Sequence, residues 1–107
     1  DGSFDAVWAA RCLMHIPNAD LPGTLDEIAR VIRPGGLLWT GTWGSESSAE
    51  GTWEEDWYEP KRFYSLRSDA DLQAMLEDRF RILSFDSGDD FEKDIDWHYQ
   101  MTLMARE

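Results

Sequence analysis

Apolar and polar residues recur with two different periods in the first part of the chain, and these periods predict a strand followed by a helix. Phe4 to Ala9 is an apolar run interrupted only by Asp5, which is typical of a parallel strand covered on both faces. A helix is predicted next, because apolar side chains recur every three or four residues and so share one face. These side chains are Leu21, Leu25, Ile28 and Ile32.

The helix is predicted to end at Pro34, Gly35 and Gly36, because proline cannot continue a helix and glycine accepts the left-handed turn that follows. Leu37 to Thr42 then predicts a second strand. A strand, a crossover helix and a strand of this length form the right-handed unit of a parallel sheet. We therefore expect residues 4–42 to organise the rest of the chain.

A second helix and a third strand are predicted further on. Ser68 precedes the helix and Asp71 follows three residues later, in the manner of a capping box. The apolar face of this helix consists of Leu72, Met75, Leu76 and Phe80. Arg81 to Phe85 predicts a strand, and the polar residues 87–94 predict a turn.

The last strand shows the clearest alternation in the chain. One predicted face carries Trp97, Tyr99, Met101, Leu103 and Ala105. The other carries His98, Gln100 and Thr102, with Met104 as the one apolar exception. Such alternation suits an antiparallel strand better than a parallel strand with both faces covered.

Residues 44–62 follow neither period, and we predict a long acidic aromatic loop there. Trp53, Trp57 and Tyr58 lie among many carboxylates. Unstructured connections longer than roughly 12 to 15 residues are usually functional loops or disordered segments. The aromatic residues favour a functional loop, and a solvated loop whose tryptophans lean on the core is the alternative.

Composition narrows the class of protein. The 107 residues suffice for a single domain, 1–107, and the 42% of hydrophobic residues predicts a folded chain. Ten basic and 22 acidic side chains give a net charge of −12, which repels phosphate and argues against nucleic-acid or membrane-surface partners. One cysteine, Cys12, excludes an internal disulfide. With no apolar run near the roughly 18 residues of a membrane span and no signal peptide, we expect a cytoplasmic location.

Two phrases in the organising segment carry a family resemblance. SFDAVWAARCLMHIP, followed by LDEIARVIRPGGLLWTG, resembles the middle of a class I S-adenosylmethionine-dependent methyltransferase, from its fourth strand through its fifth. The family phrase RVLKPGG stands here as Arg30 to Gly36 with Ile32 and Arg33 substituted. The resemblance implies an α/β fold, a partial Rossmann-like sheet of about four strands with helices packed on it. The final antiparallel strand would be inserted, giving the spatial order first, second, fourth, third.

The resemblance also implies one wall of a cofactor site. Cofactors of doubly wound sheets bind beyond the carboxyl ends of the strands. The residues just past the first strand, Ala9, Ala10, Arg11 and Cys12, would therefore touch the methionine end of S-adenosylmethionine, mainly through backbone atoms. The family's glycine-rich loop and ribose-binding acid have no counterpart in this sequence. We therefore expect the chain to begin inside the fold and to bind the cofactor weakly or not at all.

His15 is the candidate catalytic residue, and two interpretations of it stand. Its imidazole exchanges protons near neutral pH and could orient an acceptor or take its proton. It could instead pack after the strand and hydrogen-bond to backbone, which is the interpretation we favour. Cys12 and His15 lie three residues apart, but two ligands do not make a zinc site and nothing else supports a thiol nucleophile. No metal is therefore predicted.

Aromatic and basic residues after the second strand and before the second helix are candidates for the acceptor wall. Trp43 and Tyr64 lie where the resembled family builds that wall, and aromatic faces help to hold a cationic group. Arg62 and Arg67 flank Tyr64 and could meet an acidic acceptor, although solvated surface arginines are the commoner case. We take Trp43, Arg62 and Tyr64 as candidate substrate-binding residues.

These features predict the carboxyl-terminal half of a methyltransferase that acts on a small molecule and that is inactive in isolation. The alternative is a non-catalytic association module that retains the scaffold. The unpaired edge of the strand Phe4 to Ala9 would then pair with another copy of the chain, because an apolar, uncharged strand edge is a template for pairing.

Overall fold

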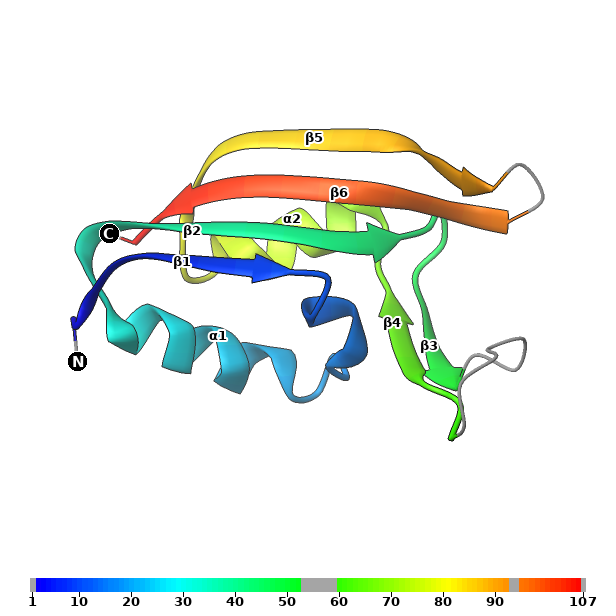
Figure 1. The fold of residues 1–107 in the computed structure, drawn as a ribbon, viewed down its shortest axis with the longest axis horizontal. Coiled ribbons are helices and arrows are strands. Elements are labelled where there is room, and N and C mark those ends of the chain that lie inside the picture. Colours follow the sequence, from blue (N-terminus) through cyan, green and yellow to red (C-terminus); the bar gives the residue numbers. More distant parts are fainter. Residues whose placement is uncertain (1, 53–59, 93–94, 107) are drawn as a thin grey trace.

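The computed structural model describes residues 2–52, 60–92 and 95–106, with the backbone alone for 89–92 and 95–97. The elements come in a mixed α/β order along the chain (Figure 1). They are β1 (Phe4–Ala10), the 3₁₀ turn η1 (Leu13–His15), α1 (Leu21–Val31), β2 (Ile32–Gly44), β3 (Ala49–Thr52), β4 (Phe63–Leu66), α2 (Asp69–Glu77), β5 (Arg81–Glu92) and β6 (Ile95–Ala105).

The main sheet has the predicted strand order, β1-β2-β6-β5. β1 and β2 are parallel and are joined by the crossover helix α1, whereas β6 runs antiparallel to both β2 and β5. Figure 1 shows the last strand, β6, lying between β2 and β5. The α/β fold class and the inserted antiparallel strand are therefore confirmed.

Both helices pack on one face of this sheet. The core cluster joins Leu21 and Leu25 of α1 to Leu72 and Leu76 of α2. Below them lie Ala9, Leu38 and Met104, which occupy one face of three adjacent strands. Burying each leucine contributes about 1.5–3 kcal/mol relative to exposure. Both predicted helix stripes are thus core surfaces.

The opposite face of the sheet carries apolar side chains but no helix among the described residues. Trp8 is 69% exposed and Phe4 54% exposed. The indole of Trp8 stacks on that of Trp39 with 3.9 Å between ring centroids. The prediction that β1 is covered on both faces is therefore wrong for this chain, because α1 and α2 cover the same face.

The alternation of β6 is confirmed, but its polar side faces the core. His98, Gln100 and Thr102 are buried under the helices, whereas Tyr99, Met101 and Leu103 are half-buried on the open face. The physical reason is a hydrogen-bond network at the start of α2. This network supplies hydrogen-bond partners to His98 and to the Gln100 amide nitrogen, which makes their burial tolerable.

Asp69, the first residue of α2, is the centre of that network. Its carboxylate accepts hydrogen bonds from Ser87 Oγ (2.5 Å) and Gln100 Nε2 (2.9 Å), and it lies 2.7 Å from His98 Nε2. Partial burial acts to raise the pKa of Asp69, but the bonds from Ser87, His98 and Gln100 outweigh it and lower that pKa. The ionised carboxylate therefore fastens α2 to β5 and β6.

The predicted N-cap of α2 is present with one change. Ser68 Oγ accepts from the Asp71 backbone N–H at 3.2 Å, as a cap should. The reciprocal bond of a capping box is relayed, because the Ser68 N–H donates to Ser48 Oγ at 2.9 Å and the Ser48 hydroxyl donates to the Asp71 carboxylate. α2 is thereby joined to the segment that precedes β3.

Three sequence predictions of irregular structure or strand length need correction. The stretch 44–62 is only partly a loop, since β3 lies inside it and pairs antiparallel with β4, and residues 53–59 fall outside the described residues. The predicted turn at 87–94 is strand as far as Glu92, and residues 93–94 are not described. β2 begins at Ile32, earlier than predicted. The sequence pattern missed these extensions because strand pairing, rather than apolar periodicity, supports them.

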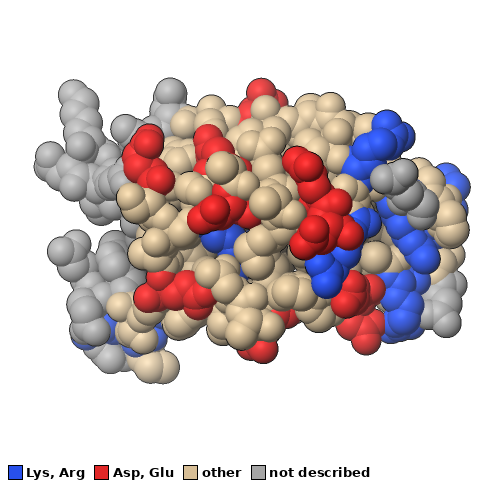
Figure 2. Space-filling view, turned by 180° about the vertical axis from the view of Figure 1, so that it is seen from behind, with Lys and Arg blue, Asp and Glu red and all other residues tan. Residues whose placement is uncertain are grey.

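Charge is unevenly spread over the molecule. Figure 2 shows the side behind the view of Figure 1, where acidic side chains are scattered and basic ones gather toward one end. Arg33 pairs with Asp5, and Arg79 pairs with Asp26. The Arg33–Asp5 pair is solvent-exposed and contributes little to stability, whereas the Arg79 side chain is partly buried. No helix in the described part of the chain is long and apolar enough to cross a membrane.

The Asp69 network predicts a specific loss of stability in acid. A carboxylate with a lowered folded-state pKa stabilises the fold above its unfolded value and loses that contribution as the pH falls through its folded value. We expect the wild-type free energy of unfolding to fall below about pH 4. Asp69→Asn should be less stable at pH 7 and show a flatter dependence in urea titrations from pH 7 to 3. Asp86→Asn, an exposed control on β5, should keep the wild-type slope; equal slopes for wild type and Asp69→Asn would contradict the assignment.

Candidate functional site

The chain segments that follow β1 and β2 meet at the carboxyl end of these two parallel strands. The Arg11 N–H donates to the Gly41 carbonyl at 2.6 Å, which ties the end of β1 to β2. Arg11 itself has φ +56°, a left-handed conformation that is uncommon for any residue but glycine. Such strained positions cluster at functional sites. The turn η1 follows directly and carries His15.

The four predicted cofactor residues lie in this bend. Ala9 is 8% exposed and its side chain belongs to the core, so only its backbone can face a ligand. Ala10, Arg11 and Cys12 are exposed. Backbone approach to a ligand at the carboxyl end of a parallel strand agrees with the position of ligand sites in open α/β sheets.

The Cys12 thiol is not activated. Although Cys12 is exposed overall, partial desolvation of its sulfur raises the pKa of Cys12, against a smaller opposing effect from a hydrogen bond with the Leu13 backbone, so the group stays a thiol at neutral pH. Across residues 2–52, 60–92 and 95–106, no group of three or more His, Cys, Asp or Glu side chains is placed to hold a metal.

His15 is held by the hairpin strand β4. Its Nδ1 lies 2.9 Å from the Phe63 carbonyl oxygen, and its ring lies 4.6 Å from the Tyr64 ring, between centroids. A carbonyl can only accept, so Nδ1 carries the proton and Nε2 has the lone pair. The backbone bond that the structural interpretation predicted is present, and it also gives the ring the tautomer that a proton acceptor requires.

The predicted catalytic and substrate-binding residues form one cluster. Tyr64 packs against Met14 of η1, with Trp43 beside them. The Arg62 guanidinium carbon lies 5.5 Å from the centroid of the Tyr64 ring. Tyr64 is only 5% exposed, so it supports the ring of His15 more than it offers a surface to a ligand. Three separate segments of the chain therefore converge here.

Tyr99 and Gly41 belong to the same region, and sequence reasoning missed them. Tyr99 meets Trp43 edge to face with 4.9 Å between centroids. A Cβ on Gly41 would collide with the Tyr99 hydroxyl and the Trp39 indole. A glycine inside a strand often marks such a close approach, so the GTWG sequence held the signal.

Arg67 departs most from its prediction. The sequence favoured a solvated surface arginine, but the residue is 2% exposed and its guanidinium bonds the chain around η1. Sequence reasoning missed this because nothing in the local pattern RFYSLRS distinguishes a buried arginine from an exposed one.

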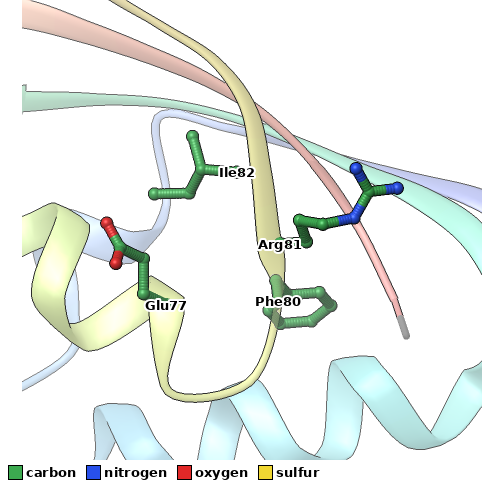
Figure 3. A pocket seen from close by; sticks show the side chains of 4 residues that line it. All are labelled: Glu77, Phe80, Arg81 and Ile82. Carbon is green, nitrogen blue, oxygen red and sulfur yellow. The ribbon is translucent and has the colours of Figure 1, made fainter.

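A hollow of about 390 Å³ lies at the far end of the sheet from this cluster and is lined by Glu77, Phe80, Arg81 and Ile82. Figure 3 shows Glu77 and Ile82 on one side of β5, with the Arg81 guanidinium extending to the other side. In a ligand site a few polar groups point toward one another, whereas the polar groups of this hollow do not. We therefore keep the cluster around His15 as the candidate site.

Comparison with known proteins finds sequence similarity in the first part of the chain. The sequence profile of the family described as "Methyltransferase domain" matches residues 1–40. The chain is 47% identical over 38 residues to Methyltransferase GfsG of Streptomyces halstedii, and 46% identical over 43 residues to the sterol 24-C-methyltransferase erg6 of Aspergillus fumigatus. These matches cover 36% and 40% of this chain but only 13% and 11% of those proteins.

Solved structures share the fold of almost the entire chain. The Burkholderia thailandensis 1,6-didemethyltoxoflavin-N1-methyltransferase, which holds S-adenosylhomocysteine, superposes with a TM-score of 0.81 at 17% identity. A SAM-dependent methyltransferase of Methanosarcina mazei gives 0.77 at 18% identity. Each match covers 99% of this chain, and respectively 45% and 60% of the solved chain.

The chain thus spans about half the length of the solved methyltransferases that share its fold. The fold by itself does not set the reaction, since the [4+2]-cyclase SpnF also superposes, with a TM-score of 0.70 at 17% identity over 99% of this chain and 52% of its own. The family profile over residues 1–40 adds sequence similarity to methyltransferases, which the shared fold alone does not provide. The sequence profile over residues 1–40 and the shared fold together make this chain similar to class I S-adenosylmethionine-dependent methyltransferases.

Proposed function

We propose that this chain is the acceptor-side half of a methyltransferase that acts on a small molecule. The observation that carries the proposal is the convergence of His15, Trp43, Arg62 and Tyr64 beyond the carboxyl ends of β1 and β2. Ligands of open α/β sheets bind at that edge. These residues come from three segments that are distant in sequence, and the hydrophobic cluster of Met14 and Tyr64, with Trp43 packed against it, holds them together.

The chemistry asks for orientation and exclusion of water more than for reactive side chains. S-adenosylmethionine, when bound, supplies an electrophilic methyl carbon on a sulfonium sulfur. An acceptor oxygen or nitrogen must approach that carbon in line, in a site shielded from solvent. His15 Nε2 would take the proton that the acceptor loses, because Nδ1 donates to the Phe63 carbonyl. Trp43 would form an apolar wall, and Arg62 would orient an acidic group of the acceptor.

The residues present fit one wall of a cofactor site and no more. The exposed chain from Ala10 to Cys12, with Arg11 in a left-handed conformation, offers backbone groups at the end of β1. The sequence contains no G-x-G-x-x-G motif after a strand, so no backbone cradle for a nucleotide is supplied. We infer that the isolated chain is inactive and that a second polypeptide segment must complete the site.

Charge and composition support a small acceptor. A net charge of −12 repels the phosphates of nucleic acids and anionic lipids. A single cysteine whose thiol stays protonated agrees with a reducing cytoplasmic setting, which we retain as part of the proposal. A small acceptor that carries an acidic group remains the best match to a site with an aromatic wall and Arg62.

Calorimetry tests the half-site directly. Titration of S-adenosylmethionine into the isolated chain should give no saturable heat at millimolar concentration, since one backbone wall cannot orient the ligand. Saturable binding with a stoichiometry of one per monomer would contradict the proposal.

A fusion provides the positive arm of the same test. The segment of the Methanosarcina mazei methyltransferase that precedes its counterpart of β1 would be joined to residue 2 of this chain. A fusion whose circular dichroism shows a folded α/β protein should bind S-adenosylmethionine with saturable heat. A folded fusion without binding would count against residues 9–12 as a cofactor wall.

The second candidate function is an association module, and the open edge of β1 favours it. β1 pairs only with β2 among the described strands and ends the sheet on that side. Phe4 and Trp8 are exposed beside this edge. The one charge on this strand, Asp5, is paired with Arg33, and the rest of the strand is apolar. Such an edge strand pairs readily with another copy of itself, which would give a dimer through Phe4 to Ala9.

Sedimentation velocity distinguishes this candidate. If β1 mediates self-association, the wild-type chain should sediment as a dimer or larger species, and Trp8→Lys should return it to a monomer, because lysine at a strand edge opposes pairing. Leu83→Lys on β5, at the other edge of the sheet, is the matched control and should leave the association unchanged. A clean wild-type monomer at high concentration would exclude self-association.

A further inference from the structure

Arg67 is a buried cation whose hydrogen-bond partners in the described part of the chain are uncharged. Its Nε donates to Asn18 Oδ1 at 2.7 Å, its Nη1 to the Leu13 carbonyl at 3.2 Å and its Nη2 to the Ile16 carbonyl at 2.7 Å. Burial lowers the pKa of Arg67, while the charge of Glu50 acts in the opposite direction. A buried guanidinium held only by carbonyl and amide oxygens is costly. Its three bonds therefore need an explanation.

The guanidinium binds backbone carbonyls on both sides of His15. Leu13 is the first residue of η1 and Ile16 is the residue just after it, so the two carbonyls that Arg67 binds lie on either side of Met14 and His15. The turn itself is closed by a hydrogen bond from the His15 N–H to the Cys12 carbonyl at 3.0 Å. Asn18, the third partner, extends the hold to the chain that leads into α1.

The backbone of Arg67 is hydrogen-bonded to the main sheet, so its side chain connects η1 to that sheet. Arg67 forms an isolated parallel bridge with Gly44, the last residue of β2. Its carbonyl accepts from the Ser45 N–H at 3.3 Å and from Gln100 Nε2 at 2.8 Å. Gly44 is required here, because a Cβ at this position would collide with that same carbonyl and with the Gln100 amide. One residue thus joins β2, β6 and the turn after β1.

We propose that Arg67 is a positioning residue that sets the ring orientation and tautomer of His15. The proposal rests on the proposed function, in which His15 Nε2 takes the proton of the acceptor. The bond from His15 Nδ1 to the Phe63 carbonyl forms only if η1 lies within hydrogen-bonding distance of β4. Arg67 sets that distance, because its backbone follows β4 directly and its side chain reaches back to η1. A planar fork with donors in several directions is needed, and a lysine ammonium cannot span the two carbonyls in the same way.

The tautomer of His15 is the signature that a purely structural arginine would not move. The chain has two histidines, so His15→Gln assigns the imidazole signals in long-range ¹H–¹⁵N spectra by loss of one set. At pH 8, where an imidazole is neutral, wild-type His15 should show predominantly the Nδ1–H form. In Arg67→Met and Arg67→Lys the ratio should shift toward Nε2–H by about tenfold, the change expected when one buried hydrogen bond is lost.

The exposed Arg81 gives the matched controls. Arg81→Met and Arg81→Lys should leave the His15 signals unchanged. A folded Arg67→Met or Arg67→Lys with wild-type His15 signals would overturn the proposal, and the lysine variant specifically tests whether the fork is required.

A measurement on the unmodified chain decides the matter if both Arg67 variants fail to fold. The Arg67 Nε–H should exchange with solvent at least about 100-fold more slowly than the Arg81 Nε–H. Equal exchange rates would show that the Arg67 side chain does not form these hydrogen bonds. Neither experiment uses a cofactor, so an unexpected calorimetric result would reject the half-site while leaving Arg67 and His15 to be judged by their own signals.

Discussion

The packing of α1 and α2 against a single face of the sheet is the interaction on which the rest of the structure depends. It places Leu21, Leu25, Leu72 and Leu76 in one core with Leu38 and Met104. It also leaves Trp8, Trp39 and Leu103 on a face that no described helix covers, around a shallow apolar hollow of about 270 Å³. Parallel strands are normally buried on both faces. In the described part of the chain, helices therefore cover only one of the two faces of the sheet.

The buried face changes character along its length. Near the chain termini it is apolar, with Leu38 opposite Met104. Toward the candidate site it becomes polar, with Thr40 opposite Thr102 and Thr42 opposite Gln100. The hydroxyls of these threonines and Gln100 Oε1 have no hydrogen-bond partner among the described residues. Unpaired buried oxygens cost free energy of folding, and these four lie on the part of the sheet that approaches the candidate site.

Much of the fold could be predicted from sequence because its signals are local. The helix stripes at Leu21 and Leu72, the N-cap at Ser68 and the alternation of β6 each depend on spacing within one element. The β3–β4 hairpin could not be predicted, because four exposed residues, Ala49 to Thr52, are strand only through their pairing with Phe63 to Leu66. Similarly, the bare face of β1 follows from where both helices pack, which the apolar run Phe4 to Ala9 does not reveal.

The candidate site divides in the same way. Trp43 and Tyr64 could be chosen because they lie where the resembled family builds its acceptor wall, Arg62 because it flanks Tyr64, and His15 because its imidazole can exchange protons near neutral pH. Arg67 could not, because its role depends on carbonyls of Leu13 and Ile16, about fifty positions earlier in the chain. Backbone acceptors carry no side-chain signature, so a buried arginine that binds them has no motif.

Among the described residues, β1 presents an uncovered edge and an uncovered face, and the proposed half-site depends on this. Site-resolved hydrogen exchange, measured at a concentration where the chain sediments as a monomer, tests it most directly. The β1 amides that point away from β2 should exchange nearly as fast as in an unfolded chain, while those of the central strands β2 and β6 stay protected. Protection of every β1 amide to the level of β2 would mean that the edge is already covered, and would contradict the account.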